Sequence, residues 1–337
     1  MKEIKLISSV GDTNGIGLEI FIKSIQSQSQ KYSNISFTLC TNISTLSEYL
    51  AKTSTGAWIE GNNLKIDNKI IHLIPCKNYS NIQFGEISES SGRHSVESFN
   101  LALEAVINRN YDALLTLPIT KKSTYLAGFN FPGHTEAISA KCGSGSHLMI
   151  LFSKNLRIAL VTIHIAISDI KSFFNRNILM TAAVLFHESL QNDFGIKSPK
   201  IAVLGLNPHA GESGSMGKEE IEIIIPSILE LKNGGIDVSG PFPADGFFGF
   251  SDYKKYDGIL AMYHDQGLIP LKLLAKGAGV NFTAGLPIVR TSPDHGSALS
   301  IAGKNIADPK STAEAIDEAI RIINNRRIKK NALLSGG

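Results

Sequence analysis

Ile4-Lys-Leu-Ile-Ser-Ser-Val-Gly-Asp-Thr-Asn-Gly-Ile-Gly17 is the stretch that decides the fold. Its apolar, β-branched first half predicts a buried strand, and its glycines lead into a segment with helical spacing from Leu18. A strand, a tight turn and a helix in this order begin a parallel sheet. The turn can offer backbone N–H groups to an anion, but its spacing is not Gly-x-Gly-x-x-Gly. It is therefore either a phosphate cradle or a tight turn that simply needs glycine.

The same alternation of strands and helices continues along the chain. Apolar strand patterns recur at residues 35–40, 70–74 and 113–117, and in a second series at 158–163, 201–206 and 259–262. Helical patterns lie at 95–108, 177–190, 218–231 and 311–327. This order predicts an α/β protein built on parallel sheets. The last helix is expected to bury an inner face made of Ala313, Ala315, Ile316, Ala319, Ile320 and Ile323.

Length and composition exclude several classes of protein. A chain of 337 residues suits two α/β domains, and 43% hydrophobic with 19% charged residues is typical of a globular protein. We expect no membrane segment and a cytoplasmic protein, because the apolar runs are short and the N-terminus resembles no signal peptide. A net charge of +3 gives little support to nucleic-acid binding. Cys40, Cys76 and Cys142 are widely separated, which predicts buried, inert thiols.

Three of the nine histidines share one context, because His164, His209 and His264 each follow a predicted buried strand. In open α/β sheets, ligands bind at the carboxyl ends of the strands. Three imidazoles that meet there can hold a divalent metal and leave positions open for substrate. No short spacing such as His-x-x-x-His supports this, so hydrogen-bonded structural histidines remain an equal alternative.

Further polar residues can serve such a site. Asp245 and Asp265 can each orient a histidine or act as a general base, although loop aspartates are common. Lys272, Asn281 and Arg290, with Lys121, supply the positive charge and donors that a phosphate or carboxylate needs, or they form a solvated rim. His134 and Thr135 lie on a polar loop, and such loops often carry function.

The segment from Asn281 to Asp308 contains the most informative pattern, His295-Gly-Ser-Ala-x-x-Ile-Ala-Gly-Lys-x-Ile-Ala. It resembles the cofactor loop of the metal-dependent β-decarboxylating dehydrogenases of the isocitrate and isopropylmalate type, which bind NAD or NADP without the Gly-x-Gly-x-x-Gly fingerprint. Small residues let a backbone approach an adenine and ribose closely, and His295 can lie against the base. The cofactor residues expected from this likeness are Gly285, His295, Gly296, Ser297, Ala298 and Asn305.

Motifs along nearly the whole chain resemble the family of 4-hydroxythreonine-4-phosphate dehydrogenases of pyridoxal-phosphate biosynthesis. They are Gly11-Asp with Gly15-Ile-Gly17, Pro132-Gly-His-Thr-Glu136, Leu206-Asn-Pro-His-Ala-Gly-Glu212, Pro243-Ala-Asp245, Tyr263-His-Asp-Gln-Gly-Leu-Ile-Pro270 and Arg290-Thr-Ser with Asp294-His-Gly296. Family members usually have proline where this chain has Thr13, Leu18 and Ala166, and a hydroxyl residue in place of Gly246. These differences concern the shape of loops more than the ligands.

The resemblance implies a metal held by His164, His209 and His264, and a substrate held by His134, Thr135, Lys272, Asn281 and Arg290. The metal is expected to be zinc, magnesium or cobalt. The resemblance also implies a homodimer with its sites at the subunit interface, so that the three histidines need not come from one chain. Asp245, Asp265 and Lys272 are the expected catalytic residues, and the proton acceptor stays open between Asp245, Asp265 and a metal-bound water.

The fold that follows is a two-lobed α/β architecture of the isopropylmalate-dehydrogenase type, in α/β/α layers with the site in the cleft. Residues 1–130 and 286–337 form the expected cofactor-side domain, and residues 131–285 the metal, substrate and dimerisation domain. The expected reaction is oxidation of 4-phosphooxy-L-threonine by NAD or NADP followed by β-decarboxylation. The alternatives are a dehydrogenase of threonate or erythronate 4-phosphate and, from another class, a phosphate acyltransferase of similar architecture.

Overall fold

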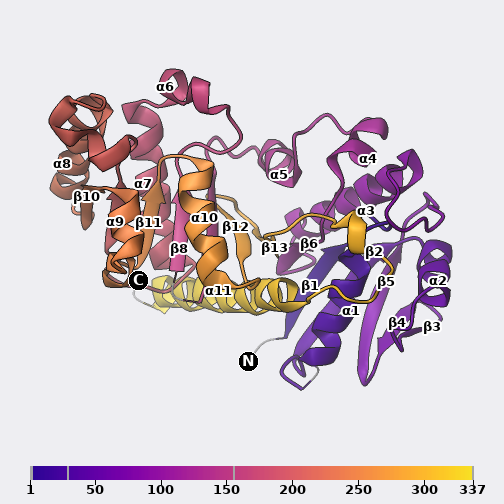
Figure 1. Ribbon diagram of the computed structural model, residues 1–337. Helices are drawn as coiled ribbons and strands as arrows, with labels where there is room; N and C mark the ends of the chain where they lie inside the picture. Colours follow the sequence, from indigo (N-terminus) through magenta and orange to yellow (C-terminus); the bar gives the residue numbers. More distant parts are fainter. Residues whose placement is uncertain (1–2, 29, 155, 336–337) are drawn as a thin grey trace. The chain divides into compact units, whose positions relative to one another are not determined.

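The computed structural model describes residues 3–28, 30–154 and 156–335, and the chain divides into two compact units (Figure 1). Unit 1 comprises residues 1–143 and 287–320, and unit 2 comprises residues 144–286 and 321–337. Residues from Arg321 onward were expected in the first domain but cluster with unit 2. One cause is Arg326, whose Nε lies 2.6 Å from Oδ1 of the buried Asp193. The predicted assignment of cofactor and metal to separate domains stays a prediction.

Unit 1 is a sheet in the strand order β13-β6-β1-β2-β5-β4-β3. Neighbouring strands are parallel from β13 to β5, and β4 and β3 follow by antiparallel pairing. Its parallel strands confirm the alternation seen in the sequence. The elements are β1 (Ile4–Ser9), α1 (Gly17–Ser27), β2 (Ile35–Thr41), α2 (Ile43–Ala51), β3 (Trp58–Glu60), β4 (Asn63–Ile66), β5 (Lys69–Pro75), α3 (Glu89–Ile107), β6 (Ala113–Thr116), α4 (Lys121–Leu126), α5 (His134–Cys142), β13 (Val289–Pro293) and the first part of α11 (Lys310–Ser335).

Unit 2 is a sheet in the order β10-β9-β11-β8-β7-β12, parallel from β10 to β8 and antiparallel at β7 and β12. Its elements are β7 (Leu148–Ser153), β8 (Leu156–Leu160), α6 (Ile170–Phe173), α7 (Arg176–Asn192), β9 (Ile201–Leu204), α8 (Ile225–Asn233), β10 (Val238–Phe242), α9 (Ala244–Gly249), β11 (Gly258–Ala261), α10 (His264–Ala275), β12 (Val280–Ala284) and the rest of α11. Among the described helices, none combines the length and apolarity needed to cross a bilayer.

Alternating side chains of β11 show the layers of unit 2. Ile259 and Ala261 belong to a core cluster with Leu268 and Leu271 of α10. Gly258 is one residue before Ile259, so a side chain there would point to the other face of the sheet, where its Cβ would meet Phe186 of α7. Since successive side chains of a strand point to opposite faces, α7 and α10 cover the two faces of the sheet. The predicted α/β/α layering is confirmed for this unit.

Several predicted bounds were wrong, for local reasons. Helix α3 begins at Glu89 instead of residue 95, because the Ser88 side chain caps it by accepting from the Ser91 N–H at 3.1 Å. The predicted helix 218–231 is interrupted, since residues 220–224 form a π-turn before α8. On α11, Ile322 is buried while the predicted Ile320 is only half-buried.

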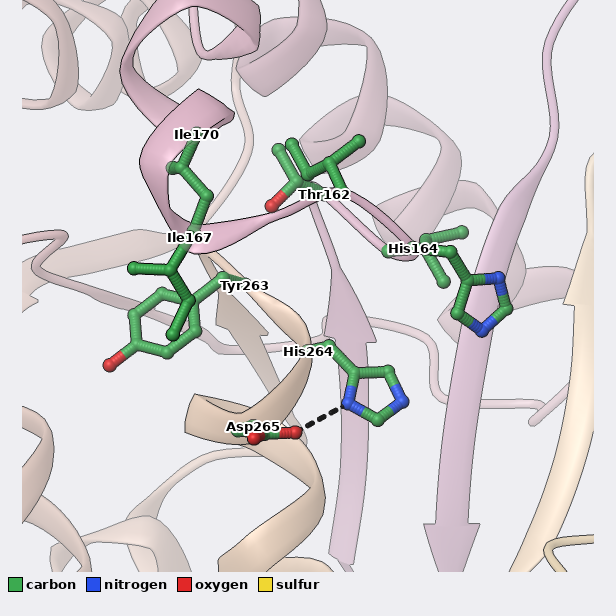
Figure 2. Close-up of a pocket in the computed structure, with 9 residues that line it drawn as sticks. Thr162, His164, Ile167, Ile170, Tyr263, His264 and Asp265 are labelled. Atoms are coloured by element: carbon green, nitrogen blue, oxygen red, sulfur yellow. Dashed lines mark hydrogen bonds and ion pairs between the residues drawn. The ribbon is translucent and has the colours of Figure 1, made fainter.

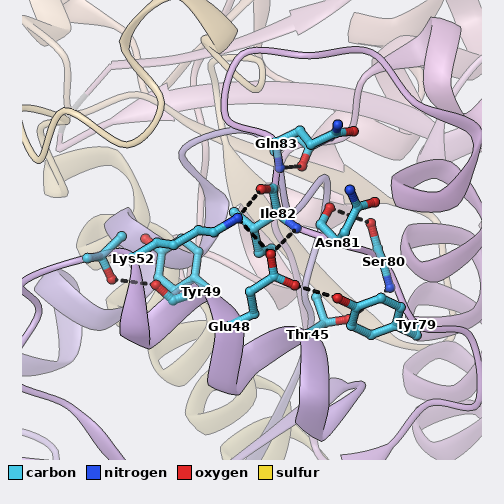
Figure 3. Close-up of polar contacts among 11 residues, drawn as sticks. Thr45, Glu48, Tyr49, Lys52, Tyr79, Ser80, Asn81, Ile82 and Gln83 are labelled. Carbon is cyan, nitrogen blue, oxygen red and sulfur yellow. Dashed lines mark hydrogen bonds and ion pairs between the residues drawn. The ribbon is translucent and has the colours of Figure 1, made fainter.

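A polar cluster ties the long segment between β5 and α3 to α2 (Figure 3). Glu48 Oε1 accepts from Lys52 Nζ at 2.7 Å and from the Ile82 N–H at 3.1 Å, and Lys52 also donates to the Ile82 carbonyl. The Ser80 N–H donates to Thr45 Oγ1 at 2.9 Å. The segment is thereby held against the glycine turn, where the Gln83 N–H donates to Asn14 Oδ1.

The three cysteines are free, as predicted. Cys40 and Cys76 are buried, and Cys142 is half-buried. Burial raises the pKa of the Cys40 thiol to about 12, so this thiol stays protonated and inert at neutral pH.

Candidate functional site

The three predicted metal histidines follow three neighbouring parallel strands of unit 2. His164 follows β8, His264 follows β11 and His209 follows β9, and the strands lie side by side in the order β9-β11-β8. Because parallel strands end at the same edge of a sheet, the fold delivers all three segments to one edge.

The structure brings two of these histidines together. The ring centroids of His164 and His264 lie 5.8 Å apart at an interplanar angle of 41°, beside a cavity of about 200 Å³ (Figure 2). Two imidazole nitrogens on one zinc ion, each ~2.1 Å from it, lie roughly 3.5 Å apart, which rings at this separation can provide. His209 is exposed on the next segment, and no group of three potential metal ligands forms within the described residues.

Asp265 defines how His264 can act. Its Oδ1 lies 2.6 Å from His264 Nδ1, so with a proton on Nδ1 the ring keeps the Nε2 lone pair for a ligand. A carboxylate behind a histidine is the usual support of a metal-binding imidazole. The donors present therefore fit a divalent metal at His164 and His264. Asp245, the other predicted base, is exposed in the first turn of α9, which contacts the 208–214 segment.

A second group of predicted residues lies in unit 1 around Arg290. Arg290 in β13 is 4% exposed and donates from Nε and Nη2 to Thr116 Oγ1 of β6, at 3.0 and 2.7 Å. Its Nη1 is buried and finds no hydrogen-bond partner among the described residues. Burial lowers the pKa of Arg290 to about 10, so it remains a cation at neutral pH. A buried cation with one such donor nitrogen suits an anionic ligand.

His134 is the first residue of α5, and its ring lies 4.6 Å from that of Phe99. Burial, and next the positive charge of Arg290, hold the pKa of His134 well below its ordinary value. The imidazole is therefore neutral at pH 7, and its buried Nε2 finds no partner in the described part of the chain. Thr135 beside it is also buried. A neutral ring can donate to or accept from a bound polar group.

The other two predicted substrate residues belong to unit 2. Lys272 is exposed on α10, in its last turn. Asn281 lies on β12 opposite Leu151, and its buried Oδ1 has no partner among the residues described. An unpaired buried amide oxygen is a second polar atom suited to a ligand.

Most of the predicted cofactor residues lie on one loop of unit 1, after β13. Gly296, Ala298 and Asn305 are exposed there, and His295 is half-buried. Ala298 and Asn305 have positive φ, 43° and 56°. Gly285 is separate, because it belongs to unit 2, where a Cβ would meet the Ser146 carbonyl.

The glycine turn packs against this cofactor loop. The Ile16 N–H donates to the Ser297 carbonyl at 3.0 Å, and a Cβ on Gly15 would collide with Ser297. The N–H groups of Asp12, Asn14 and Gly15 are also bonded within unit 1. These four donors are already bonded within the protein, and the close approach at Gly15 requires glycine, but the choice between a phosphate cradle and a tight turn stays open.

Sequence reasoning missed two residues that organise the site. Thr116 holds Arg290, and Gln266 bonds the segments that precede His264 and His209. Gln266 lies inside the Tyr263–Pro270 motif. The sequence does not reveal its role, because only the sheet order shows that β11, which precedes this motif, lies between β9 and β8.

Comparisons with known proteins identify relatives along nearly the whole chain. Residues 21–319 match the family described as "Pyridoxal phosphate biosynthetic protein PdxA". A 4-hydroxythreonine-4-phosphate dehydrogenase of Sulfurihydrogenibium sp. (strain YO3AOP1) is 39% identical over 331 residues, covering 97% of this chain and 100% of the relative. The crystal structure of 4-hydroxythreonine-4-phosphate dehydrogenase from Klebsiella pneumoniae has a TM-score of 0.79 at 30% identity, and the alignment covers 95% of this chain and 100% of that one.

The fold extends to more distant proteins. Isocitrate dehydrogenase from Methylococcus capsulatus has a TM-score of 0.55 at 12% identity, covering 96% of this chain and 87% of the other. The predicted two-lobed α/β fold class is thus confirmed, while the position of the active site in a cleft stays a prediction. The family match and the near full-length relative together show that the chain belongs to the PdxA family of pyridoxal phosphate biosynthetic proteins.

Proposed function

We propose that this chain oxidises 4-phosphooxy-L-threonine with NAD+ or NADP+ and decarboxylates the product to 3-amino-2-oxopropyl phosphate and CO2. The observation that carries the proposal is the delivery of His164, His209 and His264 to one sheet edge in a family whose relative bears this dehydrogenase name. We place the reaction in the cytoplasm.

We assign substrate recognition mainly to the buried polar atoms that have no hydrogen-bond partner among the described residues. The Arg290 cation and neutral His134 would bind the phosphate or carboxylate, with Thr135 beside them. Lys272 and Asn281 would supply the remaining charge and hydrogen bonds. Buried donors that are unpaired in the free protein discriminate strongly for a ligand that satisfies them.

In the proposed reaction the substrate C3–H leaves as hydride to the nicotinamide, and the C3 hydroxyl proton passes to Asp245, Asp265 or water. The C1–C2 bond of the resulting β-keto acid then breaks, CO2 leaves, and the enolate that remains takes up a proton at C2 from water or from the acid that received the hydroxyl proton. A divalent metal at the histidines would lower the hydroxyl pKa and stabilise the negative charge that develops on oxygen. Asp265 would hold the His264 ring in the tautomer that presents Nε2.

The cofactor is assigned to the loop that carries His295, Gly296, Ser297, Ala298 and Asn305, with Gly285 as a further contact. The support is that the exposed residues Gly296 and Ala298 of that loop are small. In addition, the Ile16 N–H of the glycine turn donates to the Ser297 carbonyl and holds the loop in place. NAD+ or NADP+ bound there would supply the hydride acceptor.

We also propose a homodimer. Ile221, Ile225 and Leu229 are exposed at spacings of four along the π-turn and α8, and Ile269 and Leu273 are exposed at the same spacing on α10. Exposed apolar stripes of this kind are typical of surfaces that another protein covers. Light scattering of the purified chain tests this, and a monomer at micromolar concentration would contradict it.

The test of the function is NADH or NADPH production by purified protein. We expect turnover of 4-phosphooxy-L-threonine that a chelator abolishes and that zinc, cobalt or magnesium restores, and little turnover of threonate or erythronate 4-phosphate. His209→Ala should lose both bound metal and turnover. Retention of both by this variant would refute the histidine site, and a preference for the sugar-acid phosphates would refute the assigned substrate.

A further inference from the structure

Two side chains hold the backbone at the point where β9 leaves the sheet. Gln266 Nε2 donates to the Gly205 carbonyl at 2.6 Å. Glu220 Oε1 accepts from the N–H groups of Leu206 and Asn207 at 2.7 and 2.8 Å. Three consecutive residues are therefore positioned by side chains from two other segments, just before His209.

Glu220 is placed to do this by the π-turn of residues 220–224 and is only 1% exposed. Its second oxygen accepts from Asn207 Nδ2 at 2.9 Å, and a Cβ on Gly211 would collide with the carboxylate. The charged group thus accepts from three donors and also borders the turn that carries His209. A buried carboxylate with this many donors is costly to leave unsatisfied, so the contacts define one conformation.

The turn itself needs such support. Residues 209–213 all have positive φ, with values of 52°, 51°, 81°, 43° and 54°, although only Gly211 among them is glycine. A left-handed conformation is unfavourable for a residue other than glycine, and it persists only where its surroundings impose it. His209 is the first residue of this run.

Gln266 also reaches the other histidine segments. Its Oε1 accepts from the Met262 N–H at 2.7 Å, and the Met262 carbonyl accepts from Thr162 Oγ1 at 2.7 Å. Met262 and Thr162 each lie two residues before a predicted metal histidine. One chain of hydrogen bonds therefore links the segments that precede His164, His264 and His209.

We propose that Glu220 and Gln266 are positioning residues that hold the left-handed turn in register with the neighbouring strands, so that His209 is presented as a metal ligand. His164 and His264 of the same chain or of a second copy would complete the site. The inference rests on the proposed metal site. Glu220 and Gln266 would act through the position of the ligand His209 and would not touch the metal themselves. Loss of such supporting contacts costs about 10- to 100-fold in metal affinity.

Zinc binding to the metal-free, folded protein tests the proposal by competition with a chromophoric chelator. Glu220→Gln keeps the size of the side chain but turns one acceptor into a donor, and we expect zinc to bind about 10- to 100-fold more weakly. Glu219→Gln is the matched control, because Glu219 bonds Asn207 Nδ2 at 2.8 Å but neither backbone N–H. Gln266→Glu, which keeps the acceptor for Met262 and loses the donor to Gly205, should weaken zinc in the same direction.

Hydrogen exchange of the metal-free protein supplies a second readout. The Leu206 and Asn207 amides should exchange faster in Glu220→Gln than in the wild type and in Glu219→Gln, because a neutral amide oxygen is a weaker acceptor than a carboxylate oxygen. Unchanged zinc affinity in Glu220→Gln and Gln266→Glu, alongside a lower melting temperature, would overturn the proposal by reducing both residues to a structural role. If Glu220→Gln fails to fold, the affinity of Gln266→Glu decides.

The two proposals fail in distinguishable ways. Weak zinc binding by the wild type that His209→Ala leaves unchanged would remove the metal site, and this inference with it. Tight wild-type binding that His209→Ala abolishes and Glu220→Gln retains would overturn only the inference.

Discussion

Acidification from pH 7 to pH 5 is expected to destabilise the fold through His94, a residue of α3 outside the catalytic site. His94 is fully buried, and its Nε2 accepts from the Asn42 N–H at 2.9 Å. Burial lowers its pKa from 6.5 to about 4, although the charge of Glu97 acts in the opposite direction. The folded protein therefore binds a proton at His94 much more weakly than the unfolded chain does.

The sign and size follow from this difference in pKa. Well above pH 6.5 the His94 side chain is neutral in both states, and its contribution to the free energy of unfolding is fully present. As the pH falls from 6.5 towards 4, only the unfolded state gains the proton, so the free energy of unfolding decreases. For values of 6.5 and about 4, the free energy of unfolding falls by roughly 2 kcal/mol between pH 7 and pH 5.

Urea unfolding of the wild type and of His94→Gln at both pH values isolates this contribution. Glutamine can still accept from the Asn42 N–H but does not titrate, so the variant should lose roughly 2 kcal/mol less stability on acidification. His72→Gln is the matched control, because His72 is exposed. Equal losses in the wild type and His94→Gln would refute the reasoning.

Three further outcomes are expected. Arg290→Lys should lower kcat/KM by about 10- to 100-fold, mainly by raising KM. Lysine cannot keep both bonds to Thr116 and also offer a donor to the substrate, and an unchanged KM would contradict this. Asp265→Asn should weaken zinc binding about tenfold or more; wild-type affinity in the variant would argue against the supporting role. Gly92→Ala should reduce the free energy of unfolding by about 1–3 kcal/mol, because its Cβ meets the α4 backbone; Gly145→Ala, with open space around it, should change little.

Much of the fold was predictable from local sequence. The β1 strand, the glycine turn and α1 were expected from residues 4–24, and the structure places them there, because apolar periodicity and glycine act over a few residues. The short strands β3 and β4 were missed because three and four residues are too few to make a recognisable pattern, although Leu64 and Ile66 of β4 are buried. The antiparallel strands β7 and β12 were also not anticipated, because a strand's partner and direction come from the sheet and not from the strand's own residues.

The sequence by itself determined that this chain is an α/β protein with histidines at the ends of buried strands, since strand ends and residue types are local properties. Only the tertiary structure decided that β9, β11 and β8 are neighbours. It alone also decided that Arg290 and His134 are buried, each with a nitrogen that no described residue pairs. It also decided that Glu220 and Gln266 hold the turn before His209. These are contacts between residues far apart in the chain, and no spacing within one segment records them.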